Sequence, residues 1–128
     1  MAESPSERPP LSWIRKFKVA FRGIYFGVVG QASFAVHLSV MALVIALAAF
    51  LRLDGVSWCL LLLCIGMVIT AELLNSAIEI LFRGLPDDIQ KRSWHALDIA
   101  AGAVLVASLT AAIVGCIVLI PAVIRYFD

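Results

Sequence analysis

The chain has 128 residues, a formal net charge of +1, 62% hydrophobic residues and a mean hydropathy of +1.02. Soluble domains are usually about 45–50% apolar, so this composition predicts a membrane protein with one domain. The small net charge gives no indication of the basic surface that nucleic-acid binding requires. The cysteines lie in apolar stretches without metal-ligand or disulfide spacing, which favours a packing role.

The N-terminal part is polar at first and then amphipathic. Residues 1–10 are polar and proline-rich, which predicts a disordered segment before a single domain over residues 11–128. A helix is predicted over residues 12–29, because apolar residues recur every three or four positions from Trp13 onward. Its basic residues group on another face: Arg15, Lys18 and Arg22. This pattern is typical of a helix that lies in the membrane interface, and no soluble core is available for the alternative of a cytosolic helix.

Three transmembrane helices are predicted next, over residues 33–51, 56–82 and 98–126. Each stretch is nearly continuous apolar sequence, long enough to cross ~30 Å of hydrocarbon. Residues 83–97 are predicted as a polar loop between the last two spans. His37, near the start of the first span, is interpreted as an interfacial hydrogen-bonding residue in preference to a ligand. The predicted fold class is therefore an all-α membrane protein with an N-terminal interfacial helix and three transmembrane helices.

The positive charges predict the topology. Five basic residues precede the first span and three lie in the 83–97 loop, whereas Arg52 and Arg125 mark the opposite side. Cytoplasmic loops carry the excess of Lys and Arg. We therefore expect the N-terminus and the 83–97 loop to be cytoplasmic.

A polar stripe interrupts the second span near its end. Glu72, Asn75, Ser76 and Glu79 are spaced i, i+3, i+4 and i+7, so they share one face of a helix. An ionisable residue at membrane depth costs roughly 2.5–3.5 kcal/mol on insertion scales and by default marks a functional site. Three spans shield such a stripe poorly from lipid, so we expect a second copy to cover it in a homo-oligomer.

The residue types in the stripe suit a cation and a proton transfer. Carboxylate and amide oxygens are ligands of Mg²⁺, which also takes nucleotide phosphates. A carboxylate in a low dielectric can act as a general base on a lipid hydroxyl. Asp87, Asp88 and Asp98 are expected at the same side of the membrane, and the sequence contains no glycine-rich phosphate loop. Two alternatives remain for the stripe: a proton-coupled transporter with Glu72 as the carrier, or hydrogen bonding between subunits alone.

One resemblance is specific. The stretch Ala71-Glu-Leu-Leu-Asn-Ser-Ala-Ile-Glu79, followed by Asp98-Ile-Ala-Ala-Gly-Ala-Val-Leu105, resembles the signature of the prokaryotic diacylglycerol kinase and undecaprenol kinase family. The resemblance covers nearly the whole chain from about Phe17. It implies a homotrimeric kinase of the bacterial inner (cytoplasmic) membrane, which transfers the γ-phosphoryl group of MgATP to the hydroxyl of diacylglycerol or undecaprenol.

The resemblance also implies roles for single residues. Glu72 takes the position of the catalytic base, with Asn75 beside it. Glu79 and Gln31 take the positions of the metal-binding residues. The positions associated with the nucleotide are occupied by Arg22, Asp88 and Asp98.

Three residues depart from the family pattern. Gln31 replaces a Glu and supplies no charge to a cation, and Arg83 replaces an Asp. Leu97 replaces a Lys that contacts the ATP phosphates, and Leu cannot contribute that charge. These departures leave open an alternative function, that of a non-catalytic or altered-specificity relative that binds lipid or scaffolds membrane proteins.

Overall fold

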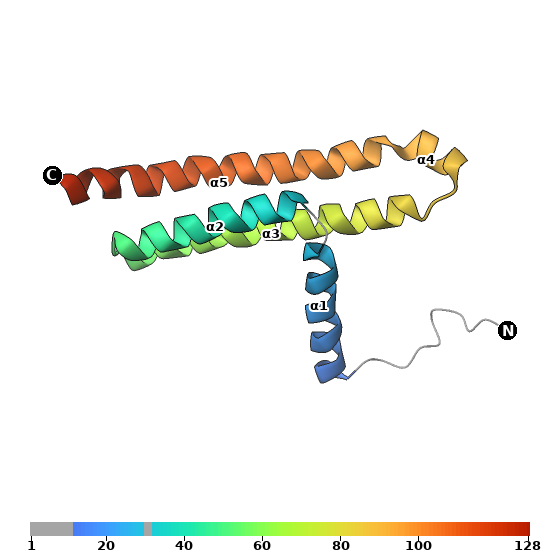
Figure 1. Cartoon of the computed structure of the whole chain (residues 1–128), viewed down its shortest axis with the longest axis horizontal. Coiled ribbons are helices and arrows are strands. Elements are labelled where there is room, and N and C mark those ends of the chain that lie inside the picture. Colours follow the sequence, from blue (N-terminus) through green and yellow to red (C-terminus); the bar gives the residue numbers. More distant parts are fainter. Residues whose placement is uncertain (1–11, 30–31) are drawn as a thin grey trace.

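The computed structural model describes residues 12–29 and 32–128, which form five helices (Figure 1). The helices are α1 (Trp13–Val28), α2 (Ala32–Phe50), α3 (Gly55–Arg83), α4 (Asp87–Ser93) and α5 (His95–Phe127). Three of them, α2, α3 and α5, are long and apolar enough to cross a membrane. The prediction of an N-terminal helix followed by three spans is confirmed.

The three long helices lie side by side, and α1 projects away from them (Figure 1). Helix α3 is central, because it packs along α5 and also contacts α1 and α2. The residues that α3 carries can therefore meet partners from three other helices. This is the feature of the fold that positions the polar stripe.

The bundle buries few apolar side chains. Met41 of α2, Val68 of α3 and Ala107 of α5 form its core. Many large apolar side chains point outward instead, among them Leu43, Leu63 and Ile113. A contiguous apolar surface of this extent is unfavourable in water and favourable in hydrocarbon, as expected for membrane spans.

Helix α1 exposes both of its faces. Trp13, Phe17 and Phe21 are exposed, and of the helix only Gly27 is buried. An interfacial helix has such an apolar face available for the headgroup boundary. Its orientation in the membrane remains a prediction.

The prediction of a loop over residues 83–97 is wrong for most of that segment. Residues 87–93 form α4, and α5 begins at His95, three residues before the predicted start of the last span. Pro86 precedes α4, with two Asp residues in its first turn and basic residues in its last. These charges complement the helix dipole, so a polar segment read as a loop forms a short helix.

Asp54 caps the N-terminus of α3. Its Oδ2 accepts hydrogen bonds from the backbone N–H groups of Val56 at 3.0 Å and Ser57 at 3.3 Å. The hydroxyl of Ser57 donates to Asp54 Oδ1 at 2.5 Å. Arg52, with a φ of 51°, adopts the left-handed conformation that turns the chain from α2 into α3. The Ser57 hydroxyl, followed by its backbone N–H, lowers the pKa of Asp54 below its ordinary value.

This cap predicts an acid-sensitive contribution to stability. A carboxyl whose pKa is lowered by folding stabilises the protein above its ordinary pKa, and the contribution is lost as the pH falls through the lowered value. Ser57→Ala should therefore reduce the loss of thermal stability between neutral and acid pH, measured by unfolding in detergent. Ser39→Ala is a matched control, because the Ser39 hydroxyl donates to Ala35 O on its own helix. An unchanged acid response in Ser57→Ala would contradict the role of the cap.

Candidate active site

Glu72 is buried where α3 faces the first turns of α2. It is 2% exposed. Its Oε1 lies 2.9 Å from His37 Nε2, within ion-pair distance, and its Oε2 accepts a hydrogen bond from Ser33 Oγ at 3.5 Å. A buried carboxylate is costly unless other groups compensate its charge. Helix α2 supplies that compensation, so the spacing of the stripe and the packing of α2 together define this site.

Asn75 and Glu79 interact with each other one turn further along α3. Asn75 Nδ2 donates to Glu79 Oε1 at 3.0 Å. Arg83 approaches the other oxygen, Glu79 Oε2, at 3.5 Å, and is itself largely exposed. The Glu79 side chain is 29% exposed. This second carboxylate is therefore partly exposed to solvent, in contrast to Glu72.

Ser76 joins the stripe to α1. It is 1% exposed, and its Oγ donates to the backbone carbonyl of Gly27 at 3.3 Å. A Cβ at Gly27 would lie 2.5 Å from Leu73 Cδ2, so a larger residue at this position would have to displace the Leu73 side chain between α1 and α3. This hydrogen bond forms within one chain, whereas the alternative that the sequence left open for the stripe is hydrogen bonding between subunits. The stripe thus lies at the junction of α1, α2 and α3.

The other predicted site residues lie apart from Glu72. Arg22 on α1, Asp88 on α4 and Asp98 on α5 are all exposed. Among the described residues, no hydrogen bond or ion pair links any of these three to Glu72. Gln31, predicted as a metal-binding residue, lies outside the described residues.

The residues present fit a cation that arrives with a nucleotide. Within residues 12–29 and 32–128, no group of three or more His, Cys, Asp or Glu side chains could form an all-protein metal cage. Mg²⁺ does not need one, because it is commonly held by one or two carboxylates together with substrate phosphates and water. Glu79 is a partly exposed carboxylate with the Asn75 amide beside it. Glu79 and Asn75 are the residues that would hold such a shared cation.

Two α2 residues have a larger part in the site than the sequence indicated. The sequence predicts an interfacial hydrogen bond for His37 and no role for Ser33, whereas both contact Glu72. They are four residues apart, so both project from the same face of a helix. The i, i+4 spacing of Ser33 and His37 indicates a polar face on α2. The sequence around them does not show that this face meets Glu72.

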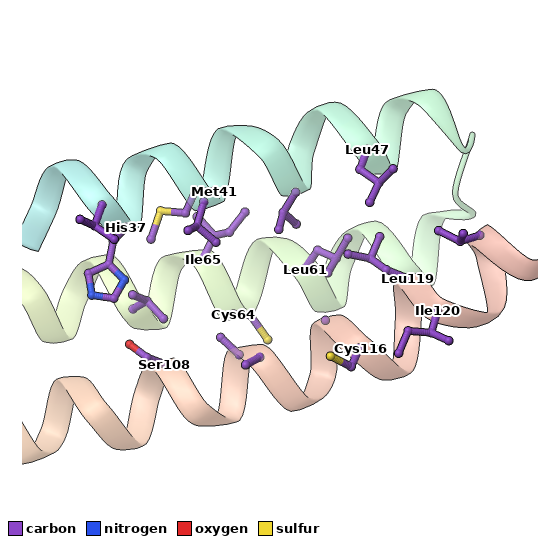
Figure 2. Close-up of a pocket in the computed structure, with 18 of the residues that line it drawn as sticks. His37, Met41, Leu47, Leu61, Cys64, Ile65, Ser108, Cys116, Leu119 and Ile120 are labelled. Atoms are coloured by element: carbon purple, nitrogen blue, oxygen red, sulfur yellow. The ribbon is translucent and has the colours of Figure 1, made fainter.

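A largely apolar groove of about 700 Å³ begins beside His37. It lies between α2, α3 and α5, with His37 and Ser108 at one end and Leu119 and Ile120 toward the other (Figure 2). Ser108 Oγ is buried and has no hydrogen-bond partner in the described part of the chain. The polar end of the groove therefore adjoins the Glu72 site, and the rest is hydrophobic.

Fold and site together define a three-span helical protein with a buried carboxylate at a junction of helices. The sequence model described as prokaryotic diacylglycerol kinase matches residues 18–119. The chain belongs to the prokaryotic diacylglycerol kinase family. This confirms the resemblance carried by the Glu72–Glu79 stripe, and the family indicates a lipid kinase.

Characterised relatives carry two kinase names. The chain is 32% identical to a diacylglycerol kinase of Synechocystis sp., over 94% of this chain and 74% of the relative. It is 29% identical to the diacylglycerol kinase of Escherichia coli, over 78% of this chain and 82% of the relative. It is also 29% identical to the undecaprenol kinase of Bacillus subtilis, over 85% of this chain and 89% of the relative. No solved structure matches the chain at a significant level.

Proposed function

We propose that the protein transfers the γ-phosphoryl group of MgATP to the hydroxyl of a membrane lipid, diacylglycerol or undecaprenol. The observation that carries this proposal is the buried Glu72 carboxylate, in contact with His37, in a chain of the diacylglycerol kinase family. A charge at this depth is expensive to maintain, and general-base catalysis gives it a function. The names of the relatives support both candidate acceptors.

The geometry suggests which oxygen of Glu72 acts. His37 engages Oε1, whereas the Ser33 contact to Oε2 is long for a hydroxyl donor. Oε2 therefore takes the proton as the O–H bond of the lipid breaks. The lipid oxygen forms a bond to the γ-phosphorus, the bond to the β–γ bridging oxygen breaks, and ADP leaves. Phosphoryl transfer of this kind depends mainly on positioning and on neutralising phosphate charge.

Glu79 and Asn75 are proposed to share Mg²⁺ with the nucleotide, whose phosphates the cation would partly neutralise. We assign Gln31 to the same cation, and Arg22, Asp88 and Asp98 to the nucleotide. The exposure of Arg22, Asp88 and Asp98 supports a site that neighbouring copies complete, as in a homotrimer. The distribution of basic residues supports a cytoplasmic site in a bacterial inner membrane.

A second function is favoured by two observations. Arg83 pairs with the carboxylate assigned to the cation, and Leu97 offers no charge to phosphates beside Asp98. A relative that binds lipid or scaffolds membrane proteins without transferring phosphate would need neither a cation at Glu79 nor a positive charge at position 97. Tight MgATP binding by the purified protein would count against this alternative.

The test is transfer of radiolabel from the γ-phosphate of ATP to lipid. Purified protein in mixed micelles is given Mg²⁺, labelled ATP and either diacylglycerol or undecaprenol. Labelled lipid that requires Mg²⁺ is the expected result, and the productive acceptor identifies the substrate. If neither lipid is labelled although both are present with MgATP, the kinase proposal is wrong for these substrates.

Leu97→Lys is expected to increase the rate of transfer at low ATP. Lys at this position places a positive charge in the first turn of α5, beside Asp98, which we assign to the nucleotide. The measurement is the KM for ATP, which should fall relative to the native chain. Leu97→Met is the neutral control, with an apolar side chain of similar size. Equal KM values for the Lys and Met variants would show that the phosphates lie elsewhere.

A further inference from the structure

His37 makes the shortest contact of the buried Glu72 carboxylate. Its Nε2 lies 2.9 Å from Glu72 Oε1, and the two side chains are 26% and 3% exposed. The contact is attractive whenever Nε2 carries a proton, in the neutral ring or in the imidazolium. It joins α2 to α3 across 35 residues of sequence, so it depends on the packing of these two helices.

The surroundings strengthen this contact. Met41, one turn further along α2, and Val68, one turn before Glu72 on α3, are buried core residues beside it. The groove that begins at His37 is otherwise lined almost entirely by apolar side chains of α2, α3 and α5 (Figure 2). Polar interactions are stronger where low-dielectric surroundings keep water from competing. His37 is thus well placed to determine how the Glu72 carboxylate is oriented.

Ser33 is a weaker partner than His37. Its hydroxyl lies 3.5 Å from Glu72 Oε2, at the limit of a hydrogen bond. The two contacts are therefore unequal: Oε1 is engaged and Oε2 is comparatively free.

We infer that His37 is a positioning residue, which fixes the Glu72 carboxylate through Oε1 so that Oε2 faces the lipid hydroxyl. This inference rests on the proposed function, because the orientation matters only if Glu72 accepts a proton. In this proposal His37 acts through Glu72 and not by contacting lipid or nucleotide. A misoriented base slows the chemical step without changing the binding of either substrate.

The kinetic test compares His37→Leu with His37→Gln. His37→Leu should lower kcat by roughly 10- to 100-fold, the usual effect of removing a partner that orients a site residue. The KM values for ATP and lipid should not change. His37→Gln retains an N–H donor and should recover a large part of kcat. Ser39→Ala, on the same helix but bonded to Ala35 O, is the control that should leave kcat unchanged.

A second experiment tests the contact between His37 and Glu72 without measuring activity. Thermal unfolding in detergent is measured for the native protein, His37→Leu, Glu72→Leu and the double variant, because each single change removes the contact. Non-additive changes in the unfolding midpoint are expected, because the two side chains interact directly. Additive changes would show that the contact is absent and would overturn the inference.

The two experiments separate the inference from the proposed function. If the native chain labels no lipid, the proposed function fails, while the thermal cycle still decides whether His37 and Glu72 interact. If the native chain is active and His37→Leu has native kcat, the positioning role is overturned. If His37→Gln is as slow as His37→Leu, positioning by a simple N–H donor is likewise overturned.

Discussion

Glu72→Gln is expected to lower lipid phosphorylation by roughly 100- to 10,000-fold, the range that a general base contributes. The amide is close to the carboxylate in size and can still contact His37 and Ser33. It cannot accept the proton of a lipid hydroxyl. The expected loss therefore lies in kcat, with the KM values for ATP and lipid little changed, and it is measured as label transferred to lipid.

The control for Glu72→Gln is Thr70→Val on the same helix. Thr70 is exposed, and its hydroxyl donates to Gly66 O on its own helix, away from the site. This variant should keep native kcat. A Glu72→Gln protein that phosphorylates lipid at the native rate would contradict the role of Glu72 as base and direct attention to Glu79.

Gly27→Val should destabilise the protein by about 1–3 kcal/mol, the usual cost of overpacking a close contact. A Cβ at Gly27 would come within 2.5 Å of Leu73 Cδ2, and the carbonyl of the same residue accepts the Ser76 hydrogen bond. The branched side chain should push α1 away from α3 and leave Ser76 Oγ buried without its partner. We expect lower activity as well, because α1 adjoins the stripe that carries the site.

The chain contains a matched control for this prediction. Gly23 is one turn earlier on α1, and a Cβ there would meet nothing within 4 Å. Gly23→Val should therefore unfold at close to the native temperature. Leu73→Ala should restore part of the stability lost in Gly27→Val, because it removes the atoms that clash. Equal destabilisation by Gly23→Val and Gly27→Val would contradict the role of the Gly27–Leu73 contact, because helix propensity favours Val over Gly at both positions.

The two predictions concern different helix contacts of one site. Glu72 faces α2, and Ser76 faces α1 one turn further along α3. Displacing α1 and neutralising Glu72 should thus both reduce catalysis, but only the first should lower the unfolding temperature strongly. Activity and stability measured on the same samples separate the chemical from the structural contribution.

Much of this protein follows from local sequence. The three spans are recognisable because twenty or so apolar residues suffice to identify a helix that crosses hydrocarbon. The stripe is recognisable because helical periodicity places residues 72, 75, 76 and 79 on one face. The sequence therefore predicts which polar residues of α3 share a face. It also predicts the family to which the chain belongs. Helix α4 was not, since a short polar segment with Pro and Asp suits a loop and a helix start equally well.

Only the tertiary structure showed the partners of the stripe. Helix α2 is predominantly apolar, with Ser33 and His37 on one face, so its sequence alone does not determine which face meets α3. The meeting of His37 with Glu72, and of Ser76 with Gly27, depends on the rotation and register of packed helices far apart in sequence. Residue types and spacing determined that α3 carries two carboxylates at membrane depth. Packing determined that one of them is buried against an imidazole while the other remains partly exposed to solvent.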